Sequence, residues 1–254
     1  MIRRLKSDVA KELPEKEYKI IPIKLNPDQE KAYKQVEKEM ILAYEKTDLA
    51  GIDTSRFMED DDIVFQKYGT IFERDLRLRQ ICLTPKLVGG KLDSAKVDAI
   101  LTLIEGRSGP ICVFSMYKGF IKILEEVIKK ELKIIPAVIH GDKTAEERYL
   151  EIEAFKSGKT EVFLGTIGSA GTGVDGLQVA GTLIFTDKDY RPKVNQQVED
   201  RIHRIGQKGN VEIISLVCQG TIEEDVEEIL QSRDEIINKL IVANEVYKKM
   251  KARQ

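Results

Sequence analysis

The sequence predicts an α/β fold: a mainly parallel β-sheet flanked by helices, preceded by an N-terminal helical extension. Three observations support this prediction. Short apolar runs rich in β-branched residues recur between residues 111 and 217. Segments of helical periodicity separate most of these runs. Residues before 94 show helical patterns without such runs. Strands that alternate with helices are typical of a parallel sheet covered on both faces.

The N-terminal extension contains two predicted helices. The first spans residues 27–46, because Asn26 is a favourable N-cap and Pro27 stands at the first helical position. The second spans residues 63–83 and is expected to end before the proline that follows. Residues 48–62 break the periodicity and end in an acidic run, so we expect a solvated loop there.

Five apolar runs predict the strands of the sheet: residues 111–114, 134–139, 161–165, 182–187 and 211–217. Amphipathic segments predict its helices: residues 94–105, 117–131, 144–156 and 221–242. Two capping boxes, Thr144 to Glu147 and Thr221 to Glu224, mark the start of the last two helices. Because ligands bind at the carboxyl ends of parallel strands, we expect the loops after these strands to form the functional site.

Composition limits the possible functions. The chain has 254 residues, which fits one or two domains. Lys and Arg number 41 and Asp and Glu number 43, and this net charge of −2 argues against nucleic-acid binding over the whole surface. Residues 188–208 hold six basic and three acidic residues, a local net charge of +3. A nucleic-acid footprint is therefore expected to be local.

Neither a membrane location nor a metal site is expected. No apolar stretch approaches the roughly 18 residues that cross a bilayer. The three cysteines have no metal-ligand spacing, and Cys112 and Cys218 lie in apolar runs that are typical of a buried core. These features predict a soluble intracellular protein, cytoplasmic in a prokaryote or virus and nuclear in a eukaryote.

Two glycine motifs resemble nucleotide-binding loops but have the wrong context. Residues 158–160 read Gly-Lys-Thr, yet Glu153 stands where a phosphate loop needs glycine, and a predicted helix precedes them. We expect a glycine helix stop there. Residues 171–176 match GxGxxG after a strand, but the next strand follows too soon for a crossover helix. We therefore expect either a glycine-rich loop that approaches an anion or simply a tight loop.

The string QVEDRIHRIGQ, which begins at Gln197, is the most specific pattern. On a helix, Gln197, Arg201 and Arg204 would share one face. Two guanidinium groups of fixed charge suit a polyphosphate. The alternative is a solvated helix whose arginines pair with acids such as Asp200. His203 is expected to form structural hydrogen bonds, because no second histidine or cysteine stands near it.

The longer string DYRPKVNQQVEDRIHRIGQ, residues 189–207, closely resembles helicase motif VI of the Swi/Snf-type DNA translocases in superfamily 2. Other segments resemble blocks of this family in the same order: residues 3–16, 78–87, 94–104, 111–117 (motif IV), 138–148, 166–177 (motif V) and 211–226. Tyr190-Arg191 stands where Trp-Asn is usual, and Asp175-Gly176 replaces Asn-Leu. The resemblance spans nearly the whole chain and implies a RecA-like three-layer fold.

The resemblance also implies a domain division and a partner lobe. Residues 1–93 would form the helical segment that enters the second lobe, residues 94–220 the RecA-like domain, and residues 221–254 a C-terminal helix on that lobe. No phosphate loop or acidic Mg²⁺-binding motif occurs in the sequence. The chain is therefore expected to be the second lobe of an ATP-dependent motor and to be inactive alone.

By resemblance, each candidate residue receives a role. Arg201 and Arg204 would act as arginine fingers on ATP that the N-terminal helicase lobe of the same protein holds with Mg²⁺. Three residues would lie near the nucleotide: Gln197, Gly173 and Asp175. Five would contact the backbone of double-stranded DNA: Ser115, Lys118, His140, Gly141 and Thr166. Two alternatives remain: an ATP-independent nucleic-acid-binding module, and a dinucleotide-dependent enzyme that uses residues 171–176.

Overall fold

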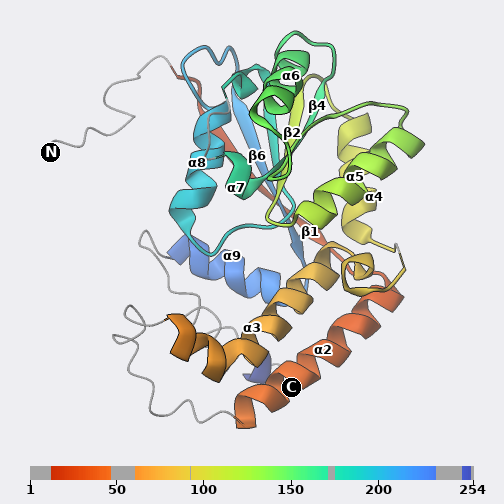
Figure 1. Ribbon diagram of the computed structural model, residues 1–254, viewed down its shortest axis with the longest axis vertical. Helices are drawn as coiled ribbons and strands as arrows, with labels where there is room; N and C mark the ends of the chain where they lie inside the picture. The colour runs from red at the N-terminus through yellow and green to blue at the C-terminus, as the bar shows by residue number, and fades with distance from the viewer. Residues whose placement is uncertain (1–12, 47–60, 92, 171–174, 233–247, 253–254) are drawn as a thin grey trace, which may run out of the picture. The chain divides into compact units, whose positions relative to one another are not determined.

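The computed structural model describes residues 13–46, 61–91, 93–170, 175–232 and 248–252 (Figure 1). The chain divides into two compact units. Unit 1 comprises Met1–Ile21, Ala99–Asp189 and Lys193–Leu216, and unit 2 comprises Pro22–Asp98, Tyr190–Pro192 and Val217–Gln254. Each unit is therefore built from segments that are distant in the sequence.

Unit 1 contains nearly all of a six-stranded sheet with the order β1-β6-β5-β2-β4-β3. Its strands are β1 (Lys16–Ile23), β2 (Ile111–Ser115), β3 (Ala137–Ile139), β4 (Val162–Thr166), β5 (Thr182–Phe185) and β6 (Val211–Cys218). The pairs β2–β4, β2–β5, β3–β4 and β5–β6 are parallel. The predicted α/β class with a parallel sheet and flanking helices is confirmed.

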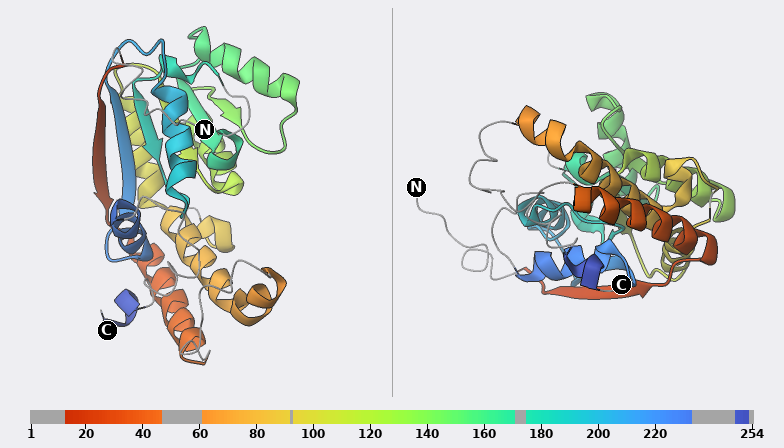
Figure 2. Two further views of the ribbon diagram at one scale, coloured as in Figure 1. Left: turned by 90° about the vertical axis from the view of Figure 1, so that its left-hand side faces the viewer. Right: turned by 90° about the horizontal axis from the view of Figure 1, so that it is seen from below.

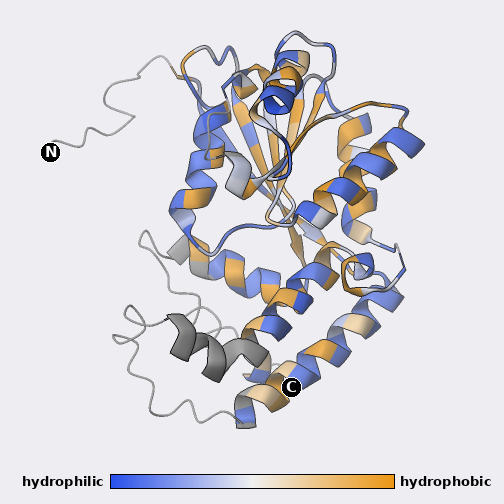
Figure 3. Ribbon diagram, in the orientation of Figure 1, coloured by the Kyte–Doolittle hydropathy of each residue, from blue (hydrophilic) through white to orange (hydrophobic). Residues whose placement is uncertain are grey.

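Helices cover both faces of the sheet, as the side view shows (Figure 2). The helices α4 (Ala95–Glu105) and α5 (Lys118–Glu131) lie on one side, and α6 (Ala145–Lys156) and α8 (Pro192–Ile202) on the other. On the α6 and α8 side, alternate strand residues form a buried apolar cluster with both helices: Cys112, Phe114, Phe163, Leu183 and Phe185 with Phe155, Val198 and Ile202. Figure 3 shows these strands as predominantly hydrophobic.

Two positions show how sequence fits the crowded sheet. Gly165 lies in β4, and a Cβ atom there would come within 2.6 Å of the Phe114 ring, so only glycine fits without a shift. At the free edge, the Val138 amide of β3 donates a hydrogen bond to the Glu151 carboxylate of α6 at 3.1 Å. This edge amide is therefore satisfied by a side chain of the same chain.

Unit 2 is helical. Its elements include α2 (Pro27–Lys46), α3 (Asp61–Leu83), the short 3₁₀-helix η2 (Pro85–Val88) and α9 (Ile222–Ser232). The buried Gln29 of α2 donates through Nε2 to the Ile81 and Cys82 carbonyls at 2.8 and 3.3 Å. These contacts satisfy carbonyls in the last turn of α3, which ends before the proline as predicted.

Several element boundaries differ from prediction. Strand β1 was missed, because most of its residues are exposed and its sequence, KEYKIIPI, lacks the apolar alternation of a half-buried strand. The strand expected at 134–139 is only Ala137–Ile139, since Pro136 has no N–H for the ladder. Helix α3 begins at Asp61, so the end of the acidic run is helical. The rest of the loop expected at 48–62 lies outside the described residues.

The two predicted capping boxes have different outcomes. Thr144 and Glu147 form the reciprocal pair, which confirms the first. At α9, the Thr221 hydroxyl oxygen accepts from the Glu223 amide, and the Glu224 carboxylate accepts from the Gly220 amide. The second prediction was wrong in detail, because a capping box needs Thr221 to accept from the Glu224 amide and Glu224 to accept from the Thr221 amide. Each observed donor lies one residue earlier in the chain. The helix expected at 221–242 is described only as far as Ser232.

Candidate functional site

The candidate site lies along the carboxyl edge of the sheet in unit 1. Ser115 at the end of β2 stands opposite Thr166 at the end of β4. Ile139 of β3 stands opposite Gly165, so His140 follows at the same edge. Three of the predicted DNA-contacting residues are thus aligned side by side by the strand register, as expected for a parallel sheet.

Asp187 organises the start of this edge, although sequence reasoning did not single it out. Its Oδ1 accepts hydrogen bonds from the Ser115 hydroxyl at 2.6 Å and from the Thr186 hydroxyl at 2.8 Å. The Met116 amide donates to Oδ2 at 3.1 Å. Ser115 is fully buried, so its hydroxyl orients the turn after β2. The signal in the sequence was an acid at the end of an otherwise apolar run.

The side chains of Thr166 and His140 are buried, and both form hydrogen bonds with neighbouring groups of the chain. The Thr166 hydroxyl donates to Ser169 Oγ at 2.9 Å. The Asp142 amide donates to His140 Nδ1 at 3.3 Å, which places the ring proton on Nε2 of a neutral imidazole. Burial, and then the positive charge of Lys122, lower the pKa of His140 below its ordinary value. Both side chains therefore shape the edge in an uncharged state.

Two lysines at the start of α5 share one carboxylate. Lys118 Nζ lies 2.9 Å from Asp142 Oδ1, and Lys122 Nζ lies 3.2 Å from Asp142 Oδ2. All three side chains are about half exposed, and the hydrogen bonds from both lysines hold the pKa of Asp142 below its ordinary value. Gly141, just before Asp142, is also exposed. This group is the exposed, charged part of the carboxyl edge.

The arginine segment is only partly helical. Helix α8 ends at Ile202, so Gln197 and Arg201 share a face of α8 while Arg204 lies in the turn that follows. The prediction that all three residues share one helical face was therefore wrong for Arg204. The cause is a three-residue turn after the helix, in which the Arg204 amide donates to the Ile202 carbonyl at 3.1 Å.

Arg204 nevertheless meets another predicted site residue. Its Nη1 lies 3.0 Å from Asp175 Oδ1, and both side chains are exposed, at 46% and 65%. The structure thus joins the arginine segment to the end of the glycine-rich segment, 29 residues earlier. The acid that pairs with Arg204 is Asp175 and not the anticipated Asp200. Gly173 lies outside the described residues.

The start of α8 is fixed by a residue that sequence reasoning missed. Buried Asn195 accepts from the Asp189 amide at 2.9 Å and donates to the Asp189 carbonyl at 2.8 Å. Val198 and Ile202 anchor the same side of the helix in the core. The resulting helix presents Gln197 to solvent on a firmly held backbone.

The two glycine motifs that resemble nucleotide-binding loops have clear structural outcomes. Gly158 adopts φ of +76° between α6 and β4, which confirms the helix stop. Between Gly176 and β5 the structure has only the three-residue 3₁₀-helix η3 (Leu177–Val179). A dinucleotide-binding crossover helix is therefore absent from this described stretch, and the dinucleotide-enzyme alternative was wrong.

Comparison with known proteins identifies the family. Residues 95–206 match the helicase conserved C-terminal domain, and residues 1–87 match the SNF2-related domain. A solved structure of the Sulfolobus solfataricus SWI2/SNF2 ATPase core in complex with dsDNA is 26% identical, with a TM-score of 0.71 over 97% of this chain and 50% of that chain. This chain belongs to the Swi/Snf-type helicases. The predicted RecA-like fold of the second lobe is confirmed with it.

Two curated relatives show how much of the protein this Swi/Snf-type chain covers. An uncharacterized ATP-dependent helicase of Mycoplasma pneumoniae is 30% identical over 95% of this chain and 22% of its own length. Nuclear protein STH1/NPS1 of Saccharomyces cerevisiae is 27% identical over 100% of this chain and 19% of its own length. The chain thus spans about a fifth of the length of these relatives. In the part that the structure describes, no helix is long and apolar enough to cross a membrane.

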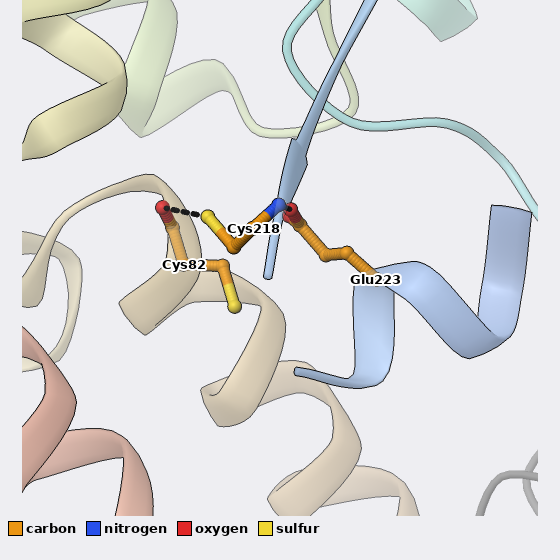
Figure 4. Close-up of side chains that lie close together, drawn as sticks. All are labelled: Cys82, Cys218 and Glu223. Carbon is orange, nitrogen blue, oxygen red and sulfur yellow. Dashed lines mark hydrogen bonds between the residues drawn. The ribbon is translucent and has the colours of Figure 1, made fainter. Parts of the chain in front are cut away.

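A second polar cluster of this Swi/Snf-type chain lies in the core of unit 2 (Figure 4). The sulfur atoms of Cys82 and Cys218 and a Glu223 carboxylate oxygen lie within 4.8 Å of one another. Glu223 already accepts from Lys96 Nζ at 2.7 Å and from the Cys218 amide at 2.9 Å. Burial raises the pKa of the Cys218 thiol. The Lys96 ammonium supplies the positive charge here, so we assign the cluster to the folded core.

Proposed function

We propose that this chain is the second motor lobe of an ATP-dependent translocase on double-stranded DNA. In this proposal, a first lobe of the same protein binds the triphosphate and Mg²⁺, and this lobe supplies arginines and grips the DNA backbone. The observation that best supports it is the contact between Arg204 and Asp175, which joins the segments resembling motifs VI and V. Opening and closing of two such lobes would convert ATP turnover into steps along DNA.

The arginine segment suits a transferring phosphoryl group. Arg201 and Arg204 each have a delocalised charge and a planar set of donors that match phosphate oxygens. They would stabilise charge that develops in the transition state. Gln197 shares the Arg201 face and would orient the arginines, while Gly173 and Asp175 would approach the ribose. No phosphate-loop lysine or acidic Mg²⁺ motif exists in the sequence, so Mg²⁺ would be held mainly by the first lobe.

The carboxyl edge suits a DNA backbone. Lys118 is exposed there and Gly141 lies beside it without a side chain, so a phosphate can approach both. His140 and Thr166 would contribute at closer range, and Ser115 would act by holding the turn after β2. Backbone contacts of this kind give affinity without sequence selectivity. We retain the division into residues 1–93, 94–220 and 221–254 as part of this proposal.

The first prediction concerns catalysis by the isolated chain. We expect no DNA-stimulated ATP hydrolysis, because the residues that hold the triphosphate and Mg²⁺ lie on the first lobe. Steady-state ATPase assays with this chain alone, and with the first lobe added or fused, test this. Turnover of about 1 s⁻¹ by the isolated chain, within the usual enzyme range, contradicts the proposal. Absence of DNA-stimulated turnover in the two-lobe protein favours the ATP-independent binding module.

The second prediction concerns the lysines that share Asp142. An Asp142→Asn substitution removes the carboxylate that pairs with Lys118 and Lys122. We expect DNA affinity to rise about threefold to tenfold at low salt, because both lysines can then neutralise phosphates in place of Asp142. The slope of log affinity against log salt should also become steeper, by roughly −0.9 for each additional phosphate neutralised. Fluorescence anisotropy with labelled duplexes of two unrelated sequences, at several salt concentrations, measures the DNA affinity and its dependence on salt.

A matched control separates this local effect from a change in net charge. Glu125 pairs with Lys129 further along the same helix, α5. Glu125→Gln changes the net charge by the same amount as Asp142→Asn but leaves the contacts of Lys118 and Lys122 with Asp142 intact. If both substitutions raise DNA affinity equally, the DNA contact does not lie at Lys118 and Lys122. A strong preference between the two duplexes also contradicts backbone recognition.

A further inference from the structure

One side of α8 is tied to the N-terminal segment of unit 1 by three contacts. Lys16 Nζ lies 2.9 Å from Glu199 Oε2, and the Tyr18 hydroxyl donates to the same oxygen at 2.8 Å. His203 Nε2 lies 2.6 Å from the Pro14 carbonyl oxygen, which can only accept, so the imidazole donates. The Lys16 and Glu199 side chains are mostly covered, at 18% and 12% exposure.

The positions of these contacts on the helix are significant. At 100° per residue, Glu199 lies on nearly the opposite side of α8 from Gln197 and Arg201. His203 follows just beyond the end of the helix, and its amide still donates to the Glu199 carbonyl at 2.8 Å. The segment Pro14–Tyr18 therefore holds the helix from the side opposite the arginine face. Lys16 also lies 3.8 Å from Asp200, so its ammonium faces two carboxylates of α8.

We propose that Lys16, with Tyr18 and the Pro14 carbonyl, positions α8 so that Arg201 is held in its working orientation. This inference rests on the proposed function, in which Arg201 acts on ATP bound to another lobe. The contacts would also transmit movement of the N-terminal segment directly to the arginine helix, because strand β1 begins at Lys16. Lys16 is thus a positioning residue that acts through Glu199.

A charge-reversal experiment in the two-lobe protein tests this inference. Lys16→Glu places a carboxylate against Glu199 and Asp200. We expect kcat for DNA-stimulated ATP hydrolysis to fall about tenfold to a hundredfold through misplacement of Arg201, with KM for ATP changed less than about twofold. The double variant K16E/E199K restores the opposite charges and should recover most of the lost kcat. The conservative Lys16→Arg should retain near-normal kcat.

Lys19→Glu is the matched control, because Lys19 lies on the same strand but pairs with Glu212 of β6. Hydrogen exchange of the isolated chain gives a readout that is independent of ATP. Amides of residues 196–202 should exchange at least about tenfold faster in Lys16→Glu than in Lys19→Glu. Equal exchange in these two variants, or a lost kcat that K16E/E199K fails to recover, overturns the inference. Faster exchange together with normal turnover in Arg201→Ala supports the contact and overturns the proposed function alone.

Discussion

Replacing Arg201 by alanine in the two-lobe protein is expected to lower kcat for DNA-stimulated ATP hydrolysis by about 10³-fold or more, the effect of losing an arginine finger. Binding of ATP and DNA should change little, because the guanidinium acts on charge that exists only in the transition state. The fold should survive, since the core of α8 is built from Asn195, Val198 and Ile202. Steady-state kinetics, nucleotide titration and a melting curve test the three parts of this expectation.

Arg204 provides a second test with a distinct local consequence. Arg204→Ala should lower kcat comparably, and it also leaves Asp175 without its 3.0 Å partner. Asp175→Asn removes the same ion pair but keeps the arginine, so it should lower kcat much less than Arg204→Ala. Such an exposed pair contributes only about 0–1 kcal/mol to folding. Comparing the two variants separates loss of the guanidinium from loss of the ion pair.

Two controls make the arginine experiments decisive. Arg201→Lys keeps the charge but loses the planar set of donors, so it should fail nearly as completely as Arg201→Ala. Arg77→Ala removes an exposed arginine of α3 that pairs with Glu73, and it should leave turnover unchanged. Normal turnover in both Arg201→Ala and Arg204→Ala would show that these arginines only form surface ion pairs.

Replacing Lys96 by methionine is expected to destabilise the protein by about 3–5 kcal/mol, since it leaves a buried carboxylate without its charge partner. Lys96 is completely buried and bonds to Glu223 at 2.7 Å. Burial alone would lower the pKa of Lys96, but the nearby Glu223 carboxylate outweighs this effect and raises it above its ordinary value. The ammonium therefore stays charged at neutral pH, and its stabilising contribution is lost only as pH rises through that raised pKa.

Urea unfolding at pH 7 followed by circular dichroism measures this loss. The double variant K96M/E223Q removes both charges and should recover most of the stability, because the introduced glutamine side-chain oxygen can still accept from the Cys218 amide. Lys129→Met breaks an exposed pair with Glu125 and should change stability by no more than about 1 kcal/mol. Equal effects of Lys96→Met and Lys129→Met would show that burial adds nothing to the Lys96 pair.

The parallel sheet and its helices could be predicted because their apolar runs and capping residues are local signals. Thr144 and Glu147, three residues apart, fixed the start of α6 in this way. Strand β1 could not be predicted, since its neighbour in the described sheet, β6, lies about 190 residues later. Its mostly exposed sequence forms a strand because it pairs with β6, and that pairing is not visible in the local pattern.

In the candidate site, too, features set by local spacing could be predicted, and features set by contacts distant in the sequence could not. Motif-like spacing placed Gln197 and Arg201 correctly on one helical face, but it could not show that α8 ends at Ile202. Nor could it show that the Ser115 hydroxyl is buried against Asp187, 72 residues away. Helix ends and hydrogen-bond partners depend on tertiary packing, which a local pattern does not encode.

The bond from the Val138 amide to Glu151 has a consequence for solubility. A sheet edge with unpaired amides is a template on which another chain can add a strand, and such addition leads to aggregation. Here an incoming strand would first have to displace the Glu151 carboxylate, which the Val138 amide and Lys143 hold in place together. The Glu151 side chain thus hinders strand addition at β3. The exposed Lys19 of β1 places a charge near the opposite edge of the sheet.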